Sequence, residues 1–226
     1  MSKFFSALAG LALVFAVSSA SAQLRAPVWP APDVLMSALT TEVMATLRQD
    51  RAAGRKTDLA HLVEVRIVPV FDFPRMTSLA LARNWRLASS DQQSILAAQF
   101  QLLLVRTYSQ VIAQFRDQAI DYKPLRAAPG ENEVTVRSAL RRSGVEPLTI
   151  DYEMADGAGG WKVFDVKVAG VSLVLAYRDS FAQAVQSGGI DGLIKALEER
   201  NRQNGPSEAA KLAPVLMLYG GSTAKP

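Results

Sequence analysis

Apolar residues recur three and four positions apart through residues 33–117, which is the spacing of one buried face of an α-helix. Asp33, directly after Pro32, is a candidate N-cap for the first helix. Ser90 and Gln93 form a Ser-x-x-Gln capping box that opens the longest predicted helix. The apolar stripe of that helix consists of Leu96, Phe100, Leu104, Tyr108, Val111 and Phe115. The pattern therefore predicts a helical N-terminal part.

Residues 118–168 change to a period of two, which is typical of β-strands with one buried face. Four strands are predicted, over 118–126, 132–142, 147–155 and 160–168. Their connections are short and contain glycine, so neighbouring strands are expected to be antiparallel. Helical spacing returns over 170–203, where one stripe consists of Val174, Tyr177, Phe181 and Val185. This order predicts an α+β fold, a curved four-stranded antiparallel sheet wrapped by helices.

Residues 1–22 have the composition of a secretory signal peptide. Lys3 provides a positive charge, residues 4–17 are almost entirely apolar, and small residues end at Ala22. The apolar stretch is short of the about 20 residues that cross a bilayer, so a retained membrane anchor is the less favoured alternative. We expect cleavage after Ala22 and a periplasmic protein. One domain is predicted over 23–204, followed by a disordered tail over 205–226.

The composition narrows the possible chemistry. The chain has 226 residues, one histidine (His61), no cysteine and a formal net charge of +4. Without cysteine there is no disulfide or thiol chemistry. A single histidine supplies only one imidazole, which disfavours a histidine-based metal cluster or catalytic triad. No run of Lys and Arg indicates a nucleic-acid partner. We therefore expect no cofactor, no metal and no nucleic acid, and we expect a monomer.

Several segments resemble one protein family. The clearest are GWKVFDVKVAGVSLV at 160–174, AYRDSF at 176–181 and GIDGLIKALEERN at 189–201. The other segments are FDFPRMTSLALARNWR at 71–86, LLVRTYSQVIAQFRD at 103–117, TVRSALR at 135–141 and IDYEM at 150–154. In this order they resemble the MlaC family, also called the toluene-tolerance or phospholipid-binding ABC-transporter auxiliary family. Ala176 departs from the Asn that often stands there, and the tail after Gly205 has no counterpart.

The resemblance implies an NTF2-like fold with a deep apolar lipid pocket between sheet and helices. It also implies a carrier without enzymatic activity that maintains outer-membrane lipid asymmetry. Such a carrier exchanges phospholipid between an outer-membrane lipoprotein complex and an inner-membrane ABC permease complex with its substrate-binding subunit. The energy is then supplied by the permease, because the chain itself carries no nucleotide-binding motif.

Given this resemblance, twelve residues are the candidate lining of the implied pocket. They are Phe73, Met76, Leu104, Tyr108, Val136, Ile150, Tyr152, Phe164, Val171, Val174, Tyr177 and Phe181. Four methionines are expected to contribute flexible thioether side chains that adapt to acyl chains. They are Met36, Met44, Met76 and Met154. The alternative for every member of both sets is an ordinary core position.

Three charged residues within the predicted strands have predicted roles of their own. Arg137 and Arg141 alternate with the apolar residues of their strand, and they are candidates for contact with a lipid headgroup or an acidic partner. A solvated strand face is the alternative. Asp165 lies within a valine-rich strand, where a buried carboxylate needs a partner. We expect a salt bridge between Asp165 and Arg178.

Two other function classes compete with a carrier. An NTF2-like isomerase or dehydratase would use Asp165 or Asp151 as a base, with Tyr152 as oxyanion donor. Strand alternation predicts opposite faces for Phe164 and Asp165, so Asp165 lies outside the pocket if Phe164 lines it. The other class, a structural adaptor, predicts a solid core without a cavity.

Overall fold

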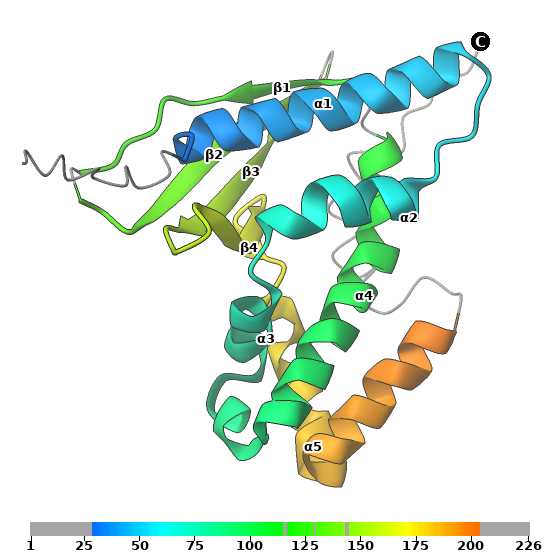
Figure 1. Cartoon of the computed structure of the whole chain (residues 1–226), viewed down its shortest axis with the longest axis vertical. Helices are drawn as coiled ribbons and strands as arrows, with labels where there is room; N and C mark the ends of the chain where they lie inside the picture. Colours follow the sequence, from blue (N-terminus) through cyan, green and yellow to red (C-terminus); the bar gives the residue numbers. More distant parts are fainter. Residues whose placement is uncertain (1–28, 115–116, 129, 143–144, 204–226) are drawn as a thin grey trace, which may run out of the picture.

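The fold combines one antiparallel sheet with helices that pack on one of its faces and extend beyond it (Figure 1). The computed structural model describes residues 29–114, 117–128, 130–142 and 145–203. The predicted signal peptide, the tail over 205–226 and Phe115 lie outside these residues. In the described part of the chain, no helix combines the length and the apolar character needed to cross a bilayer. The predicted α+β class with an antiparallel sheet is confirmed.

The helical elements come in two groups along the chain. The first group consists of α1 (Pro32–Ala52), α2 (Leu59–Leu62), the π-helical turn η1 (Val63–Ile67), the 3-10 turn η2 (Val68–Val70), α3 (Phe73–Leu81), the 3-10 turn η3 (Ala82–Leu87) and α4 (Ser90–Gln114). The second group consists of η4 (Leu175–Tyr177) and α5 (Arg178–Arg202). Gly189 has φ 67° and ψ −166°, so α5 is broken at the predicted Gly188-Gly189 stop.

The helix caps correct two predictions. The capping box before α4 uses Ser89 and Gln92, because Ser89 N donates to Gln92 Oε1 at 3.0 Å and Gln92 N donates to Ser89 Oγ at 3.2 Å. Gln93 instead donates its amide to the carbonyl oxygens of Trp85 and Ala88. At α1 the N-cap is Ala31. Asp33 lies in the first turn, where its negative charge interacts favourably with the positive end of the helix dipole.

The sheet has five strands, one more than predicted. They are β1 (Ala119–Tyr122), β2 (Glu133–Arg142), β3 (Val145–Ala155), β4 (Lys162–Val168) and β5 (Val171–Ser172), each antiparallel to the next in that order. Ala169 and Gly170 form a tight turn with φ of 50° and 79°, and β5 then pairs back on Lys167 and Val168. The residues after Gly170 therefore form a strand, where helical spacing was predicted.

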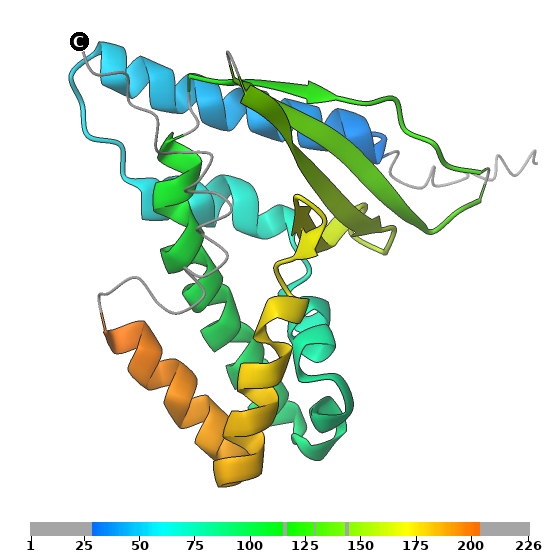
Figure 2. The same ribbon diagram turned by 180° about the vertical axis from the view of Figure 1, so that it is seen from behind.

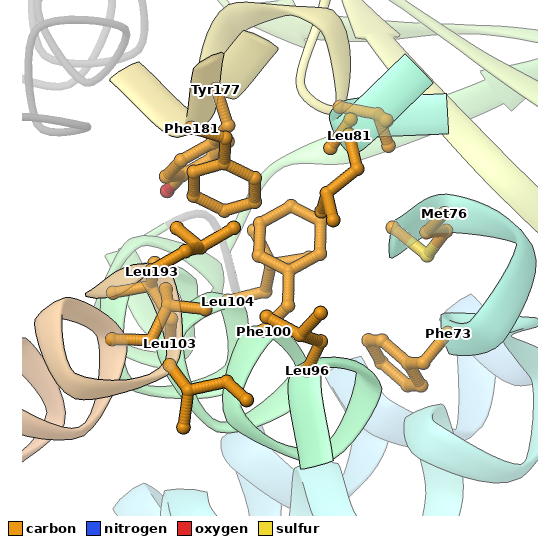
Figure 3. Packing of buried hydrophobic residues seen from close by; sticks show 14 of the residues in the cluster. Phe73, Met76, Leu81, Leu96, Phe100, Leu103, Leu104, Tyr177, Phe181 and Leu193 are labelled. Carbon is orange, nitrogen blue, oxygen red and sulfur yellow. The ribbon is translucent and has the colours of Figure 1, made fainter. Parts of the chain in front are cut away.

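Apolar residues gather in two main cores, one in each half of the molecule (Figures 1 and 2). The sheet and α1 form the upper half in Figure 1, and α3, the first part of α4 and α5 form the lower half. Figure 3 shows the lower core, where the edge of the Phe100 ring meets Tyr177 and Phe181 at centroid distances of 5.0 and 5.2 Å. Helix α4 runs through both halves and joins them.

Candidate functional site

A cavity of about 230 Å³ lies between the inner face of the sheet and the helices that cover it. Its wall consists of Met36, Leu39, Thr40, Val43, Met44, Val63, Ile67, Val68, Phe71, Phe73, Met76, Leu104, Val105, Tyr108, Ser109, Val111, Ile112, Ile120, Leu140, Ile150, Tyr152, Val166, Val168 and Leu173. Among the described residues, no charged side chain belongs to this wall. The cavity is therefore suited to hydrocarbon.

The sheet forms one side of the cavity through the alternation of its strands. Tyr152 pairs with Val166, and Ile150 pairs with Val168, so these four side chains of β3 and β4 point to the same face. Leu140 extends this face onto β2, where Leu140 lies opposite Leu148. The inner face of the sheet is thus a continuous apolar floor.

Helices form the opposite side, from residues that recur at helical spacing. Helix α1 contributes Met36, Thr40 and Val43, and α4 contributes Leu104 and Tyr108. The segment between them is irregular, since η1 is a π-helical turn that leads directly into the 3-10 turn η2. A 3-10 turn has poorer hydrogen-bond geometry than an α-helix, and a π-helical turn is rare and often found at functional sites.

The polar groups of the wall are neutral hydroxyls. Thr40 Oγ1 and Tyr122 OH are 2.5 Å apart, and the Ser109 hydroxyl donates to the Val105 carbonyl within α4. Burial raises the pKa of both Tyr108 and Tyr152. These phenols stay protonated at neutral pH, and the wall offers no general base among the described residues.

Six of the twelve predicted lining residues lie on the cavity wall. They are Phe73, Met76, Leu104, Tyr108, Ile150 and Tyr152. Met36, Met44 and Met76 also lie on it, whereas Met154 is completely buried in the core between the sheet and α1. Contact with a lipid stays a prediction for all of them.

The other six predicted residues lie elsewhere. Val174, Tyr177 and Phe181 pack around Phe100 in the lower core, because η4 and α5 lie below the sheet. Val136 is packed into the sheet core with 1% of its surface exposed. Val171 is 40% exposed on the short edge strand β5. These apolar residues follow the predicted periodicity, but their faces meet other side chains or solvent.

Phe164 is displaced by a β-bulge. Glu153 pairs with Asp165, and Met154 pairs with Val163, so Phe164 is the extra residue on β4. Its ring lies under the guanidinium of Arg75, with 3.6 Å between Arg75 Cζ and the ring centroid. Sequence reasoning assumed unbroken alternation in β4, so it placed Phe164 in the pocket.

Sequence reasoning missed wall residues on α1, on α4, on the sheet and in the segment 63–71. Val63, Ile67, Val68 and Phe71 line the cavity although they were not among the candidates. Their apolar spacing was a usable signal. The sequence did not show that this segment closes over the sheet, because the irregular turns η1 and η2 set its direction.

Arg137 and Arg141 lie on the outer face of the sheet, away from the cavity. They alternate with Val136 and Leu140, which face inwards. Arg141 forms an ion pair with Asp121 on β1, and Arg137 lies opposite Asp151 on β3. Both arginines are exposed to solvent on this outer face, whereas a headgroup in the cavity would lie on the other side of the sheet.

Asp165 does not form the predicted salt bridge with Arg178. Its Oδ1 accepts hydrogen bonds from Val166 N at 2.8 Å and from Val174 N at 3.2 Å, and Arg178 donates to the Leu79 carbonyl oxygen at 3.1 Å. Backbone N–H groups thus supply the partners that the buried carboxylate needs. Burial raises the pKa of Asp165, while bonds from Ser172, Val174 and Val166 oppose this shift.

The two carboxylates considered as catalytic bases lie outside the cavity wall. Asp165 lies opposite Glu153, and Asp151 lies opposite Arg137, so both face away from Tyr152 and Ile150. A base and an oxyanion donor on opposite faces of one sheet cannot act on the same substrate. The geometry does not favour an isomerase or a dehydratase.

Comparison with known proteins identifies related chains. Residues 37–199 match the family described as MlaC protein. The intermembrane phospholipid transport system binding protein MlaC of Haemophilus influenzae is 22% identical over 177 residues, which cover 76% of this chain and 83% of that protein. The toluene tolerance protein ttg2D of Pseudomonas putida is 24% identical over 164 residues, which cover 71% of this chain and 75% of that protein.

A solved structure gives the same relationship. The phospholipid-binding protein from Ralstonia solanacearum, in complex with a phospholipid, has 36% sequence identity and a TM-score of 0.68. The match covers 76% of this chain and 97% of that chain. The family match, the similar sequences and the similar fold agree over most of the described residues, and the chain therefore belongs to the MlaC protein family.

Proposed function

We propose that this protein is a periplasmic phospholipid carrier that holds acyl chains in its cavity and performs no chemistry on them. The observation that carries the proposal is the apolar wall between sheet and helices, which has no charged side chain in the described part of the chain. The phospholipid named with the Ralstonia solanacearum structure supports the ligand class. A solid adaptor core is disfavoured by the cavity itself.

The energetics explain why a carrier needs such a wall. Burial of hydrocarbon is worth about 0.8 kcal/mol per CH₂, so two long acyl chains avoid roughly 20–25 kcal/mol of contact with water. The cavity of about 230 Å³ is smaller than the about 300–1,000 Å³ that is usual for ligand pockets. We infer that the helices move apart when lipid enters, with η1 and η2 moving first.

The route of the lipid is part of the same proposal. The carrier receives and delivers phospholipid between an outer-membrane lipoprotein complex and an inner-membrane ABC permease complex with its substrate-binding subunit, and so maintains outer-membrane lipid asymmetry. The name of the Haemophilus influenzae relative, an intermembrane transport binding protein, supports this route. Export through the predicted signal peptide and an NTF2-like relationship of the fold stay predictions. Arg137 and Arg141 are the proposed partner contacts, because they are exposed on the outer face of the sheet.

Native mass spectrometry tests the carrier function directly. The protein is secreted into a bacterial periplasm, purified without detergent and sprayed from volatile buffer, and its organic extract is then identified. We expect a mass increment of one phospholipid that disappears on denaturation. A lipid-free mass that persists after incubation with phospholipid vesicles contradicts the proposal.

A further inference from the structure

The position of Arg137 and Arg141 leaves open which cations face the phosphate of a bound lipid. A second cavity, of about 790 Å³, lies where the end of α1, the connection to α2 and the end of α4 meet. Figures 1 and 2 both show these three parts at the same end of the molecule. Three cations, Arg51, Arg55 and Lys56, and one carboxylate, Asp58, line this cavity, and we call it the basic recess.

The basic recess adjoins the apolar cavity on the same helices. On α1, Val43 lines the cavity and Leu47, one turn later, lines the recess. On α4 the boundary falls between Ile112 and Ala113, and Val63 and Leu59 mark it on the third side. The wall between the two spaces is therefore one helical turn thick and apolar.

The distance along α1 suits one lipid molecule across both spaces. Eight residues separate Val43 from Arg51, which corresponds to about 12 Å along a helix. Val43, Leu47 and Arg51 are four residues apart, so they lie on one face of α1. A lipid whose chains fill the cavity needs its glycerol near Leu47 and its phosphate near Arg51.

The cations of the recess remain able to bind an anion. Arg51 pairs with Asp117 at 2.6 Å and Arg55 with Asp50 at 2.6 Å, but the two arginine side chains are 60% and 65% exposed. The pair of Arg51 with Asp117 is exposed on both sides and therefore weak, whereas Arg55 uses its Nε and one NH2 group on Asp50, whose side chain is 18% exposed. Each arginine has five N–H donors. Both guanidinium groups therefore keep donors that a phosphate can accept from.

Lys56 differs from the two arginines of the recess in its interactions. It is exposed and has no ion pair within the part of the chain that the structure describes. Asp58 on the recess wall caps α2 by accepting from His61 N, and the neighbouring Asp50 accepts from Arg55 and Thr57. Gly54, with φ of 67°, makes the turn that brings these residues back over α1, where Arg55 N donates to Asp50 O.

We propose that the basic recess binds the phosphate of the lipid whose acyl chains occupy the cavity. The inference rests on the proposed carrier function. It follows because a phosphate inside the apolar cavity has no cation to compensate its desolvation, whereas Arg51, Arg55 and Lys56 lie one turn beyond the wall. Leu47 and Leu59 part when the lipid enters, because they form the boundary.

The test compares the loading of two lipids that have identical acyl chains, phosphatidylglycerol and diacylglycerol. Each lipid is presented to the protein in vesicles that carry no net charge of their own and contain no phosphatidylcholine. The variant is Lys56→Glu, and the matched control is Arg83→Glu, an equal charge change at an exposed position of η3 in the other half of the molecule. We expect Lys56→Glu to lower phosphatidylglycerol loading roughly tenfold relative to the control, since the substitution removes a charge-assisted hydrogen bond to the phosphate and puts a like charge beside it. Diacylglycerol loading stays the same.

The outcomes separate the inference from the function on which it rests. If the unmodified protein takes up neither lipid, the carrier function itself fails. If Lys56→Glu and Arg83→Glu load phosphatidylglycerol equally and the unmodified protein takes it up normally, phosphate binding by the basic recess is contradicted, while the carrier function stands. A third arm adds inorganic phosphate to lipid-free protein. Binding of phosphate that needs Lys56 but leaves lipid loading unchanged identifies a free-phosphate site and also overturns the inference.

Discussion

Phe100 is the largest side chain that the described core buries completely, and its contacts define the lower half of the molecule. Its ring meets Tyr177 and Phe181 edge-on, so residues from α4, η4 and α5 depend on one aromatic group. We expect Phe100→Ala to lower the free energy of unfolding by about 3–5 kcal/mol. Urea denaturation measures the loss, and Ile95→Ala on the exposed side of α4 is the control. A loss below 1 kcal/mol contradicts this view of the core.

Asp165 acts through its hydrogen bonds, which fasten β5 and the start of η4 to β4. Asp165→Ala leaves the N–H groups of Val166 and Val174 without an acceptor, and each unsatisfied group costs about 1–3 kcal/mol. Asp165→Asn keeps an acceptor oxygen, so its loss of stability is smaller. Denaturation of both variants, together with lipid loading of the folded proteins, measures these effects. Normal stability of Asp165→Ala combined with loss of a chemical activity points to an enzyme instead.

The pH dependence of stability provides a separate test of Asp165. Burial raises its pKa in the folded state above the ordinary value of 3.8, so the folded state binds this proton more readily than the unfolded state. The stability that results is present below pH 3.8 and is lost as pH rises through the folded pKa. The unmodified protein therefore loses stability relative to Asp165→Asn across this interval. A constant difference between their denaturation curves contradicts the raised pKa.

At the scale of elements, periodicity predicts most helices and strands but not how they are joined. The stripe from Leu96 to Val111 in α4 and the alternation in β2 and β3 are regular, and all three elements form where they are predicted. The bulge at Phe164 depends on pairing with β3, and the turn at Ala169 requires a positive φ that is uncommon for alanine. Neither is visible in the pattern of a single strand. For this reason the prediction that Phe164 lines the pocket is wrong, and so is the predicted number of strands.

Strand β3 offers a test of the cavity, because neighbouring residues point to opposite faces. Ile150 faces the cavity, and Thr149 is exposed on the outer face. We expect Ile150→Trp to fill the space that acyl chains need and to lower lipid loading at least tenfold, with little change in stability because the cavity receives the added volume. Thr149→Trp leaves loading unchanged. Native mass spectrometry measures both variants, and equal loading contradicts a lipid site at this cavity.

The irregular segment of η1 and η2 offers a test of opening. Its π-helical and 3-10 turns contribute Val63, Ile67 and Val68 to the cavity wall, and such irregular turns are less stable than a continuous α-helix. We expect the amides of residues 63–68 and of Val70 to exchange with deuterium faster than those of α4 in lipid-free protein, and to become protected when lipid is bound. Helix α5 is the internal reference, because its core around Phe100 lies outside the cavity. Unchanged exchange over 63–70 places the opening elsewhere.

At the scale of the whole molecule, α4 connects a solid core to a hollow one. Leu96 and Phe100 belong to the lower core, Tyr108 contacts both, and Val111 belongs to the sheet core. Sequence reasoning placed Val174, Tyr177 and Phe181 in the pocket because an apolar stripe looks the same whether it meets another stripe or an empty space. The gap depends on how far the helices stand from the sheet. Periodicity does not contain that distance.

A bound lipid fills this gap, so it is expected to stabilise the whole chain by mass action. A monomeric lysophospholipid at 100 times its dissociation constant raises the free energy of unfolding by about 2.7 kcal/mol if it binds only the folded state. We expect this rise in the unmodified protein and in Thr149→Trp, and little of it in Ile150→Trp, whose indole occupies the cavity. Urea denaturation with and without the lipid measures the difference. If the free energy of unfolding rises equally in Ile150→Trp, the lipid binds at a surface outside the cavity. If the rise is lost in Ile150→Trp, the lipid stabilises the chain by binding in the cavity between sheet and helices.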